Sequence, residues 1–334
     1  MSAPDLVPIA ACPLCRSRER LPLLAEGEPI EVVRCRGCGL VYASAVHDAD
    51  FLGEDYYGAR ARQETQDPDL SGGRPGVDRK RRDLARYDQL TGGALLRPRR
   101  GARALDLGCH TGLLLDALRE AGYRTVGVER SPAAEHARAA GHEVHHLDIE
   151  TSPPDLEAPF DVITMTHVLE HLLDPLAAIE WASRQLSDRG VLIVEVPNWG
   201  DLMRPLWGAR YRPLELGDHV SFFERRTLTL AAQQANLAVR TLWSAPTASG
   251  LLFPSILTSV DLARAARQED DGVELPHSVA RRPDSAGGLI SQLRGPLTKG
   301  VLRALDALDP WLERAASAES TWGANIIAVL ERPA

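Results

Sequence analysis

Two kinds of hydrophobic pattern alternate along the middle of the chain. Between residues 83 and 244, short apolar runs typical of buried strands alternate with longer stretches in which apolar residues recur at helical spacing. The runs predict strands at residues 103–107, 124–129, 143–146, 160–165, 191–196 and 238–243. The stretches between them predict helices at residues 112–121, 132–140, 175–186 and 226–235. Strands that alternate with helices in this way pair in parallel through crossover connections, so the pattern predicts an α/β fold.

Shifts in composition divide the chain into five segments. The first holds four of the five cysteines and ends in an aromatic cluster, whereas the second is almost free of large apolar side chains. After the α/β core, a segment of loops and helical leucine spacing precedes a last strand at residues 325–330. We therefore expect a zinc-binding module at residues 1–58, a linker or lid at 59–82 and the α/β core at 83–244. A helical insertion is expected at 245–322, and the last core strand at 323–334.

The four cysteines of the first segment form two pairs with the spacing of zinc ligands. Two residues separate Cys12 from Cys15 and Cys35 from Cys38, and 19 residues lie between the pairs. Four thiolates at this spacing close a tetrahedral zinc site without an open position, so the expected role of the metal is structural. The alternatives are a redox-active pair, which needs only one such motif, and four buried free thiols.

The charge and the apolar pattern limit the binding partners and the cellular compartment that we expect for this protein. The 334 residues carry 46 acidic and 38 basic side chains, and this net charge of −8 excludes nucleic acid, whose phosphates require a basic surface. The most apolar later stretch, residues 250–262, is interrupted by Pro254 and Asp261 and is shorter than the roughly 20 residues that span a bilayer. Because the number of cysteines is odd and the N-terminus does not resemble a secretion leader, we expect a cytoplasmic protein.

A strand, a glycine turn and a helix start follow one another in the run ALDLGCHTGLLL, residues 104–115. Such a turn brings backbone N–H groups and a helix N-terminus against a ligand. Gly108 and Gly112 are four residues apart, which differs from the G-x-G-x-x-G spacing of enzymes that transfer hydride from a dinucleotide. Glu129 follows Gly108 by 21 residues, at the distance where such folds place a carboxylate on ribose hydroxyls.

Five stretches of the core resemble the class I S-adenosylmethionine-dependent methyltransferases in order and spacing. They read ALDLGCHTG, VGVERSP, HHLDI, FDVITMTHVLEHLLDP and GVLIVEVPN, and they lie within residues 83–244. The resemblance implies a Rossmann-like seven-stranded sheet and S-adenosylmethionine as the cofactor. The residues that it assigns to this cofactor are Asp106, Gly108 and Gly112 at the methionine end, Glu129 at the ribose, Asp148 and Ile149 at the adenine, Thr166 and His167 beside the sulfonium, and also Tyr57 and His110.

The sequence departs from the resemblance at His110, where the family usually has a glycine in the middle of the loop. A side chain at this position is strained if the backbone needs a positive φ, and the imidazole then lies close to the cofactor. The resemblance also implies that the last two strands form an antiparallel pair. The helical insertion at residues 245–322 would interrupt this pair, and we expect it to cap the active site or to form a homodimer contact.

The run His167-Val-Leu-Glu170-His171 spells H-x-x-E-H, the inverted signature of zinc peptidases. That chemistry needs both histidines on one long helix. Here the motif follows a strand directly, and Asp174-Pro175 begins a new helix three residues later. We therefore favour a loop at the carboxyl edge of the sheet, where open α/β sheets bind ligands.

His219 is the preferred candidate for a base that deprotonates the acceptor, with His171 second and His167 third. The stretch LGDHVSFFE around His219 resembles the branch of zinc-containing methyltransferases that includes sugar C-methyltransferases. We expect Asp218 or Glu224 to orient the ring of His219 and to raise its pKa, since imidazole titrates near neutral pH. The alternative is a ring that fixes an apolar loop by a hydrogen bond to a backbone carbonyl.

The function predicted from these features is methyl transfer to oxygen, nitrogen or carbon of a small molecule, in specialised metabolism or in modification of glycans or nucleotide sugars. Nine basic residues between Arg79 and Arg103 would suit a phosphorylated or carrier-bound acceptor, but we favour a solvated helix face as the explanation. The rival hypothesis is a catalytically inactive methyltransferase fold that serves as a scaffold with a structural zinc site.

Overall fold

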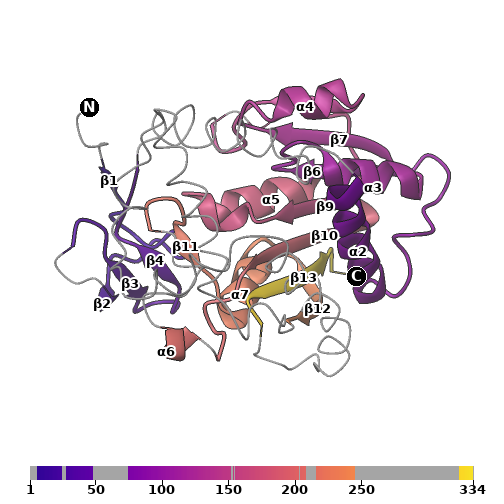
Figure 1. Cartoon of the computed structure of the whole chain (residues 1–334). Coiled ribbons are helices and arrows are strands. Elements are labelled where there is room, and N and C mark those ends of the chain that lie inside the picture. Colours follow the sequence, from indigo (N-terminus) through magenta and orange to yellow (C-terminus); the bar gives the residue numbers. More distant parts are fainter. Residues whose placement is uncertain are drawn as a thin grey trace, which may run out of the picture.

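The computed structural model describes residues 6–24, 28–47, 74–202, 204–207, 216–244 and 323–333, except residues 152 and 154. The centre of this part is a seven-stranded sheet with the strand order β12-β13-β10-β9-β6-β7-β8 (Figure 1). Its strands are β6 (Arg103–Leu107), β7 (Arg124–Glu129), β8 (Glu143–His146), β9 (Phe160–Thr166), β10 (Leu186–Pro197), β12 (Ala238–Trp243) and β13 (Asn325–Glu331). The α/β class and the Rossmann-like seven-stranded sheet expected from the sequence are confirmed.

The strands β8, β7, β6, β9 and β10 pair in parallel, whereas β13 is antiparallel to β10 and to β12. The core residues of the central strands alternate between the two faces of the sheet. In β10, for example, Leu192 and Val194 pack on one face and Val191 and Ile193 on the other. Strands buried on both faces read as continuous apolar runs, which is why VLIVEV gave a clear strand signal.

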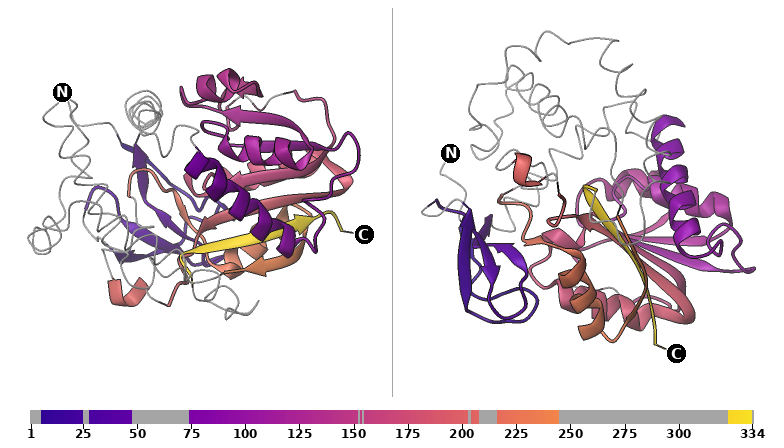
Figure 2. Two further views of the ribbon diagram at one scale, coloured as in Figure 1. Left: turned by 45° about the vertical axis from the view of Figure 1, so that its right-hand side comes forward. Right: turned by 90° about the horizontal axis from the view of Figure 1, so that it is seen from below.

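Helices cover both faces of the sheet (Figures 1 and 2). The helices are α2 (Arg74–Leu90), α3 (Leu113–Ala121), α4 (Ala134–Ala139), α5 (Pro175–Gln185) and α7 (Arg225–Gln234), with a short α6 (Arg204–Trp207). Core residues of α2 and α3 pack on one face, and those of α5 and α7 on the other. Within the part of the chain that the structure describes, no helix is long and apolar enough to cross a membrane.

Residues 74–82 are helical, which corrects the prediction that they belong to a linker. They form the first half of α2, whose buried side chains include Val77, Leu84 and Tyr87. The only large apolar residue before position 83 in this helix is Val77, so the sequence lacked the apolar repeat that signals a helix. The family resemblance was placed within residues 83–244, so it did not include residues 74–82. The rest of the predicted linker lies outside the described residues.

The cysteine-rich segment forms a small β module beside the core. Its strands are β1 (Leu6–Pro8), β2 (Arg20–Leu24), β3 (Val32–Cys35), β4 (Val41–Ala43) and β5 (Ala45–His47). The sheet β11-β4-β3-β2 includes one core strand, β11 (Ser221–Phe222), which pairs antiparallel with β4 (Figure 2). Leu14 and Tyr42 of the module lie in the same hydrophobic cluster as Val220 and Phe223. The module and the core therefore share a sheet and a hydrophobic core.

The antiparallel pair β12–β13 confirms the expected arrangement of the last two strands, and the predicted insertion between them lies outside the described residues. Its two neighbouring residues lie close together at the carboxyl end of β10. The amide of Asn198 donates to Ser244 Oγ at 3.4 Å and to the carbonyl of Gly323 at 2.9 Å. Ser244 and Gly323 therefore lie at one place on the sheet edge.

Leu115 of α3 tests the packing behind the glycine turn. This side chain is fully buried in a cluster with Ala134 and Ala137 of α4, so Leu115→Ala should lower the free energy of unfolding by about 2–5 kcal/mol in urea denaturation. The matched control is Leu96→Ala, which truncates a side chain that is 45% exposed and should change stability by less than about 0.5 kcal/mol. Equal losses in the two variants would contradict this packing.

Candidate active site

The parallel register places the ends of β6, β7, β9 and β10 along one edge of the sheet. Asp106 of β6 lies opposite Thr164 of β9, and Thr166 at the end of β9 lies opposite Glu195 of β10. Glu129 ends β7 in the same edge. The loops that follow these strands carry most of the residues predicted to bind the cofactor or to act on the acceptor. The fold therefore brings to one edge residues as distant in sequence as Asp106 and Glu195, which are 89 positions apart.

The glycine turn after β6 has three residues in the left-handed region of backbone conformation. Gly108, His110 and Gly112 have φ angles of 74°, 49° and 85°. His110 thus occupies a position with positive φ, where a non-glycine residue carries strain. At Gly108 a Cβ would meet Val168 Cγ2 at 2.4 Å, and at Gly112 one would meet Ala137 Cβ at 2.9 Å. Both glycines thus allow close packing of the turn against its neighbours.

Glu129 joins the turn after β6 to the turn after β7. Its Oε2 accepts from the backbone N–H of His110 at 2.9 Å, and its Oε1 accepts from the backbone N–H of Ser131 at 2.7 Å. The carboxylate is 7% exposed. Two backbone donors fix both oxygens, and each carboxylate oxygen retains a second lone pair for a ligand hydroxyl.

The other acids assigned to the cofactor have their own partners. Asp106 is buried and accepts from Thr164 Oγ1 at 2.6 Å, and burial raises the pKa of Asp106 to about 6. Asp148 follows β8, lies 3.5 Å from Arg130 and accepts from the backbone N–H of Glu150. Ile149 is half-buried against the main hydrophobic cluster. Tyr57 lies outside the described residues.

His167 and Glu170 follow β9 in a tight turn. His167 has a φ of 55°, and the turn η2 (Leu169–His171) is a single 3-10 turn. No long helix carries the H-x-x-E-H residues in this described stretch, in agreement with the preference for a loop. His167 Nδ1 donates to Glu170 Oε1 at 3.1 Å. Burial raises the pKa of a carboxyl group, but this bond and the neighbouring imidazoles outweigh it and lower the pKa of Glu170.

Three functional candidates escaped the sequence analysis. Glu195 is an acid within the apolar strand β10, and its carboxylate accepts from Tyr87 Oη at 2.5 Å and from Asn325 Nδ2 at 2.7 Å. Asn325 also contacts His167 Nε2 at 3.3 Å. Although burial raises the pKa of Glu195, the His167 charge and these hydrogen bonds lower it. In the sequence, the signal for Glu195 was an acid within a buried apolar strand. Its contacts with Tyr87 and Asn325 become visible only in the fold.

His171 and His219 pack edge to face with ring centroids 4.7 Å apart. Asp218 Oδ1 lies 3.1 Å from His171 Nδ1, so this acid forms a pair with His171. Glu224 forms an ion pair with Arg34 at 2.9 Å. His219 is buried against His171, and its orientation by Asp218 or Glu224 stays a prediction.

The β module fixes the loop that carries His219. The backbone of Val220 accepts from Ala43 N at 2.9 Å in the module and donates to Glu170 O at 2.8 Å in the core. Next to it, Ser221 and Phe222 pair with Tyr42 and Val41. The position of His219 relative to the turn after β9 therefore depends on the module.

The four cysteines lie together within the module. The Sγ atoms of Cys12 and Cys38 are 3.5 Å apart, those of Cys15 and Cys35 are 3.4 Å apart, and all four lie within 4.8 Å of one another. These separations are far longer than a disulfide and close to the ~3.8 Å edge of a tetrahedron with Zn–S bonds of about 2.3 Å.

Backbone geometry around the cysteines is that of two matching turns. The residue after each pair, Arg16 or Gly39, has a positive φ of 62° or 85°. Gly37 allows the two turns to pack closely, because a Cβ there would lie 3.3 Å from Ser17 Cβ and 3.4 Å from Cys15 Sγ. Backbone N–H groups also donate to the sulfurs, such as that of Leu40 to Cys38. Such bonds stabilise thiolates that bind a metal.

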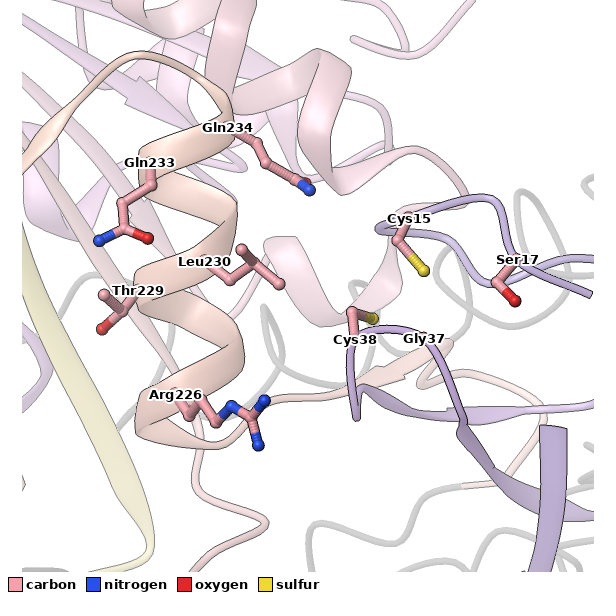
Figure 3. A pocket seen from close by; sticks show the side chains of 9 residues that line it. All are labelled: Cys15, Ser17, Gly37, Cys38, Arg226, Thr229, Leu230, Gln233 and Gln234. Atoms are coloured by element: carbon pink, nitrogen blue, oxygen red, sulfur yellow. The ribbon is translucent and has the colours of Figure 1, made fainter. Parts of the chain in front are cut away.

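A pocket of about 700 Å³ separates the cysteine turns from α7 (Figure 3). Cys15 and Cys38 line it on the module side, and Leu230, Gln233 and Gln234 line it on the helix side. None of the residues assigned to the cofactor lines this pocket in the described part of the chain. It is therefore separate from the carboxyl edge of the sheet.

Four of the nine basic residues between residues 79 and 103 pair with acids of the described part of the chain. Lys80 and Arg86 lie 3.6 Å and 3.5 Å from Asp83, Arg81 lies 2.7 Å from Glu120, and Arg99 lies 3.0 Å from Asp161. Side chains engaged in this way favour the interpretation as a solvated surface over a patch for a phosphorylated acceptor.

Residues 78–242 match a protein-family model described as a methyltransferase domain. A ubiquinone biosynthesis O-methyltransferase from Xylella fastidiosa is 34% identical over 133 residues, which cover 36% of this chain and 54% of that protein. One from Idiomarina loihiensis is 32% identical over 105 residues, covering 29% of this chain and 43% of that protein. The chain thus spans about half the length of the curated relatives it matches. A methyltransferase structure from Archaeoglobus fulgidus is 15% identical, with a TM-score of 0.45, and the match covers 83% of this chain and 100% of that one.

The hydrogen bond between Tyr87 and Glu195 ties α2 to the site. Tyr87→Phe removes a donor from a buried carboxylate and should lower the free energy of unfolding by about 1.5–3 kcal/mol. Tyr123→Phe is the matched control, because the buried Tyr123 hydroxyl donates to a neutral carbonyl and its removal should cost about 0.5–1.5 kcal/mol. Urea denaturation measures both, and a smaller loss at Tyr87 than at Tyr123 would contradict the assignment of a charged acceptor.

Proposed function

We propose that this chain, whose residues 78–242 form a methyltransferase domain of the class I S-adenosylmethionine-dependent fold, methylates a hydroxyl oxygen of a small molecule. The observation that carries the proposal is Glu129, a carboxylate fixed by backbone donors beside the glycine turn. The preference for oxygen rests on the matching relatives, which are named O-methyltransferases. Membership of the branch with sugar C-methyltransferases, and a role in specialised metabolism or sugar modification, stay predictions.

The residues at the strand ends fit the parts of S-adenosylmethionine, which supplies an electrophilic methyl group when bound. The free lone pairs of Glu129 suit the two ribose hydroxyls. Asp148 and Ile149 lie one strand further along the edge and would flank the adenine. The turn at Gly108–Gly112 would hold the methionine part, with the His110 imidazole beside it. These residues bind and orient the cofactor, and positioning of this kind supplies most of the catalysis in a displacement at carbon.

The acceptor side of the site lies at the ends of β9 and β10, where Thr166, His167, His171 and His219 gather. An imidazole here would take the proton of the acceptor hydroxyl or position the hydroxyl. Ser244 and Gly323, which flank residues 245–322, both contact Asn198 at the same edge, and this supports the prediction that the segment between them covers the site.

We also propose that Cys12, Cys15, Cys35 and Cys38 bind one structural zinc ion. The separations of their sulfur atoms and the N–H donors around them support this proposal. The module is too small to bury a core of its own, and a structural zinc ion supplies folding free energy to such segments. Through β4 and Val220, the ion would hold the loop of His219 in place.

Substitution of Glu129 tests the cofactor site. Glu129→Ala removes a charge-assisted hydrogen bond to the ribose and should weaken S-adenosylmethionine binding by about 1–3 kcal/mol in calorimetric titration. The control Glu135→Ala removes an exposed acid of α4 that pairs with Arg138, and its affinity should equal that of the wild type. Unchanged affinity in Glu129→Ala would place the ribose elsewhere, and no binding to the wild-type chain would favour the inactive scaffold.

Metal analysis of the purified chain tests the zinc site. We expect one zinc per chain in the wild type and none in Cys35→Ser, accompanied by a lower unfolding temperature, because three thiolates cannot close the site. Cys109→Ala is the matched control, since Cys109 is buried in the core cluster beside Leu115 and should retain the zinc. A zinc-free wild-type protein, or an unchanged zinc content in Cys35→Ser, would refute the proposal.

A further inference from the structure

Glu170, His171 and His219 form a second group of metal-ligating side chains, separate from the cysteines. Each offers one ligand atom, and these atoms lie within 4.8 Å of one another. Glu170 is 1% exposed and His219 is 6% exposed, so the group is largely removed from water. The Nε2 atom of His171 lies 3.9 Å from Glu170 Oε1. Two ligands on one ion with bonds of about 2.1 Å lie between about 3 and 4.2 Å apart, so this separation suits a shared ion.

The carboxylate of Glu170 is incompletely satisfied by the protein. Its Oε1 accepts from His167, but its Oε2 is buried and has no hydrogen-bond partner among the described residues. A buried carboxylate oxygen without a partner costs free energy, because it has lost its water without a replacement. A cation bound beside Glu170 would provide the missing interaction and the compensating charge.

Asp218 prepares His171 for coordination. The Nδ1 atom of His171 lies 3.1 Å from Asp218 Oδ1 and 3.3 Å from the Asp218 carbonyl oxygen, so Nδ1 carries the proton and donates it to either. The lone pair of the ring is then on Nε2, which faces Glu170. A carboxylate that fixes the tautomer of a ligating histidine is the usual outer partner of a metal-bound imidazole.

We infer that Glu170, His171 and His219 bind one divalent transition-metal ion at the acceptor side of the site. Two imidazoles and one carboxylate suit ions such as Zn²⁺, Mn²⁺ or Co²⁺, and three protein ligands leave coordination positions open. The turn that bears Glu170 follows Thr166 and His167, where the acceptor is proposed to bind. The ion would take a hydroxyl oxygen of the acceptor and lower the pKa of that hydroxyl.

This role rests on the proposed methyl transfer, and it specifies a hydroxylated acceptor. The O–H bond of the acceptor breaks and its proton leaves to solvent. An oxygen lone pair then forms the bond to the methyl carbon, and the electrons of the methyl–sulfur bond stay on sulfur, which becomes a neutral thioether. His219 is then a metal ligand, and this assignment replaces the one that makes it a free base.

Cobalt titration tests the site directly on the whole chain. The cysteine site is first filled with one equivalent of zinc, and Co²⁺ is then added. We expect one Co²⁺ per chain, with weak d–d absorption and without the intense bands of cobalt thiolates. Glu170→Gln and His171→Gln should each weaken Co²⁺ binding at least tenfold, and Asp218→Asn should weaken it about tenfold or more through the orientation of His171.

The matched control is His145→Gln, which alters a partly exposed histidine of β8 beside Glu143 and should leave Co²⁺ affinity unchanged. The unfolding temperature of each variant, measured without Co²⁺, shows whether weaker binding is due to a lost ligand or to a lost fold. If one variant does not fold, the Co²⁺ affinities of the other variants test the inference. Failure of the zinc-loaded wild type to bind Co²⁺, or equal affinity in all variants, would overturn the inference. S-Adenosylmethionine titration of the same samples keeps the two proposals apart, because a chain that binds the cofactor but no Co²⁺ refutes only the metal site.

Discussion

The parallel register of β6, β7, β9 and β10 is the constraint on which the site depends. Because these strands point the same way, the loops that follow them all emerge at one edge of the sheet. The buried apolar residues on both faces fix that register, since a shift of one residue would move every side chain to the opposite face. The same hydrophobic core therefore positions the residues proposed to bind the cofactor and those proposed to face the acceptor, which we call the cofactor half and the acceptor half of the site.

The two halves are connected to that core in different ways. Glu129 links the turns after β6 and β7 through backbone N–H groups, so the cofactor half is held within the core domain itself. The acceptor half includes His219, whose loop lies between the turn after β9 and strand β4 of the cysteine module. The module, which shares a sheet and a hydrophobic cluster with the core, thus determines where His219 lies. The proposed zinc ion would act on the proposed site through this connection.

The sequence predicted the elements with strong periodicity and the residues with fixed spacing from them. The apolar runs gave the strands, and the distance from Gly108 placed Glu129 at the end of β7, as the structure has it. The half of α2 before residue 83 was missed because it buries little besides Val77. Glu195, Tyr87 and Asn325 were missed because they come from three distant segments, and no local pattern reports contacts across 108 or 130 residues. For the same reason, the contact between Asp218 and His171, which are 47 positions apart, was not predicted.

Hydrogen exchange of the whole chain with and without S-adenosylmethionine tests the central claim most directly. The claim is that the strand ends of β6, β7 and β8 bind this cofactor. It predicts that the cofactor slows amide exchange in residues 108–115, 129–131 and 147–149, and leaves the cysteine turns at residues 12–17 and 35–39 unchanged. Unchanged exchange in all three ranges at saturating cofactor, or protection confined to the cysteine module, would contradict the account.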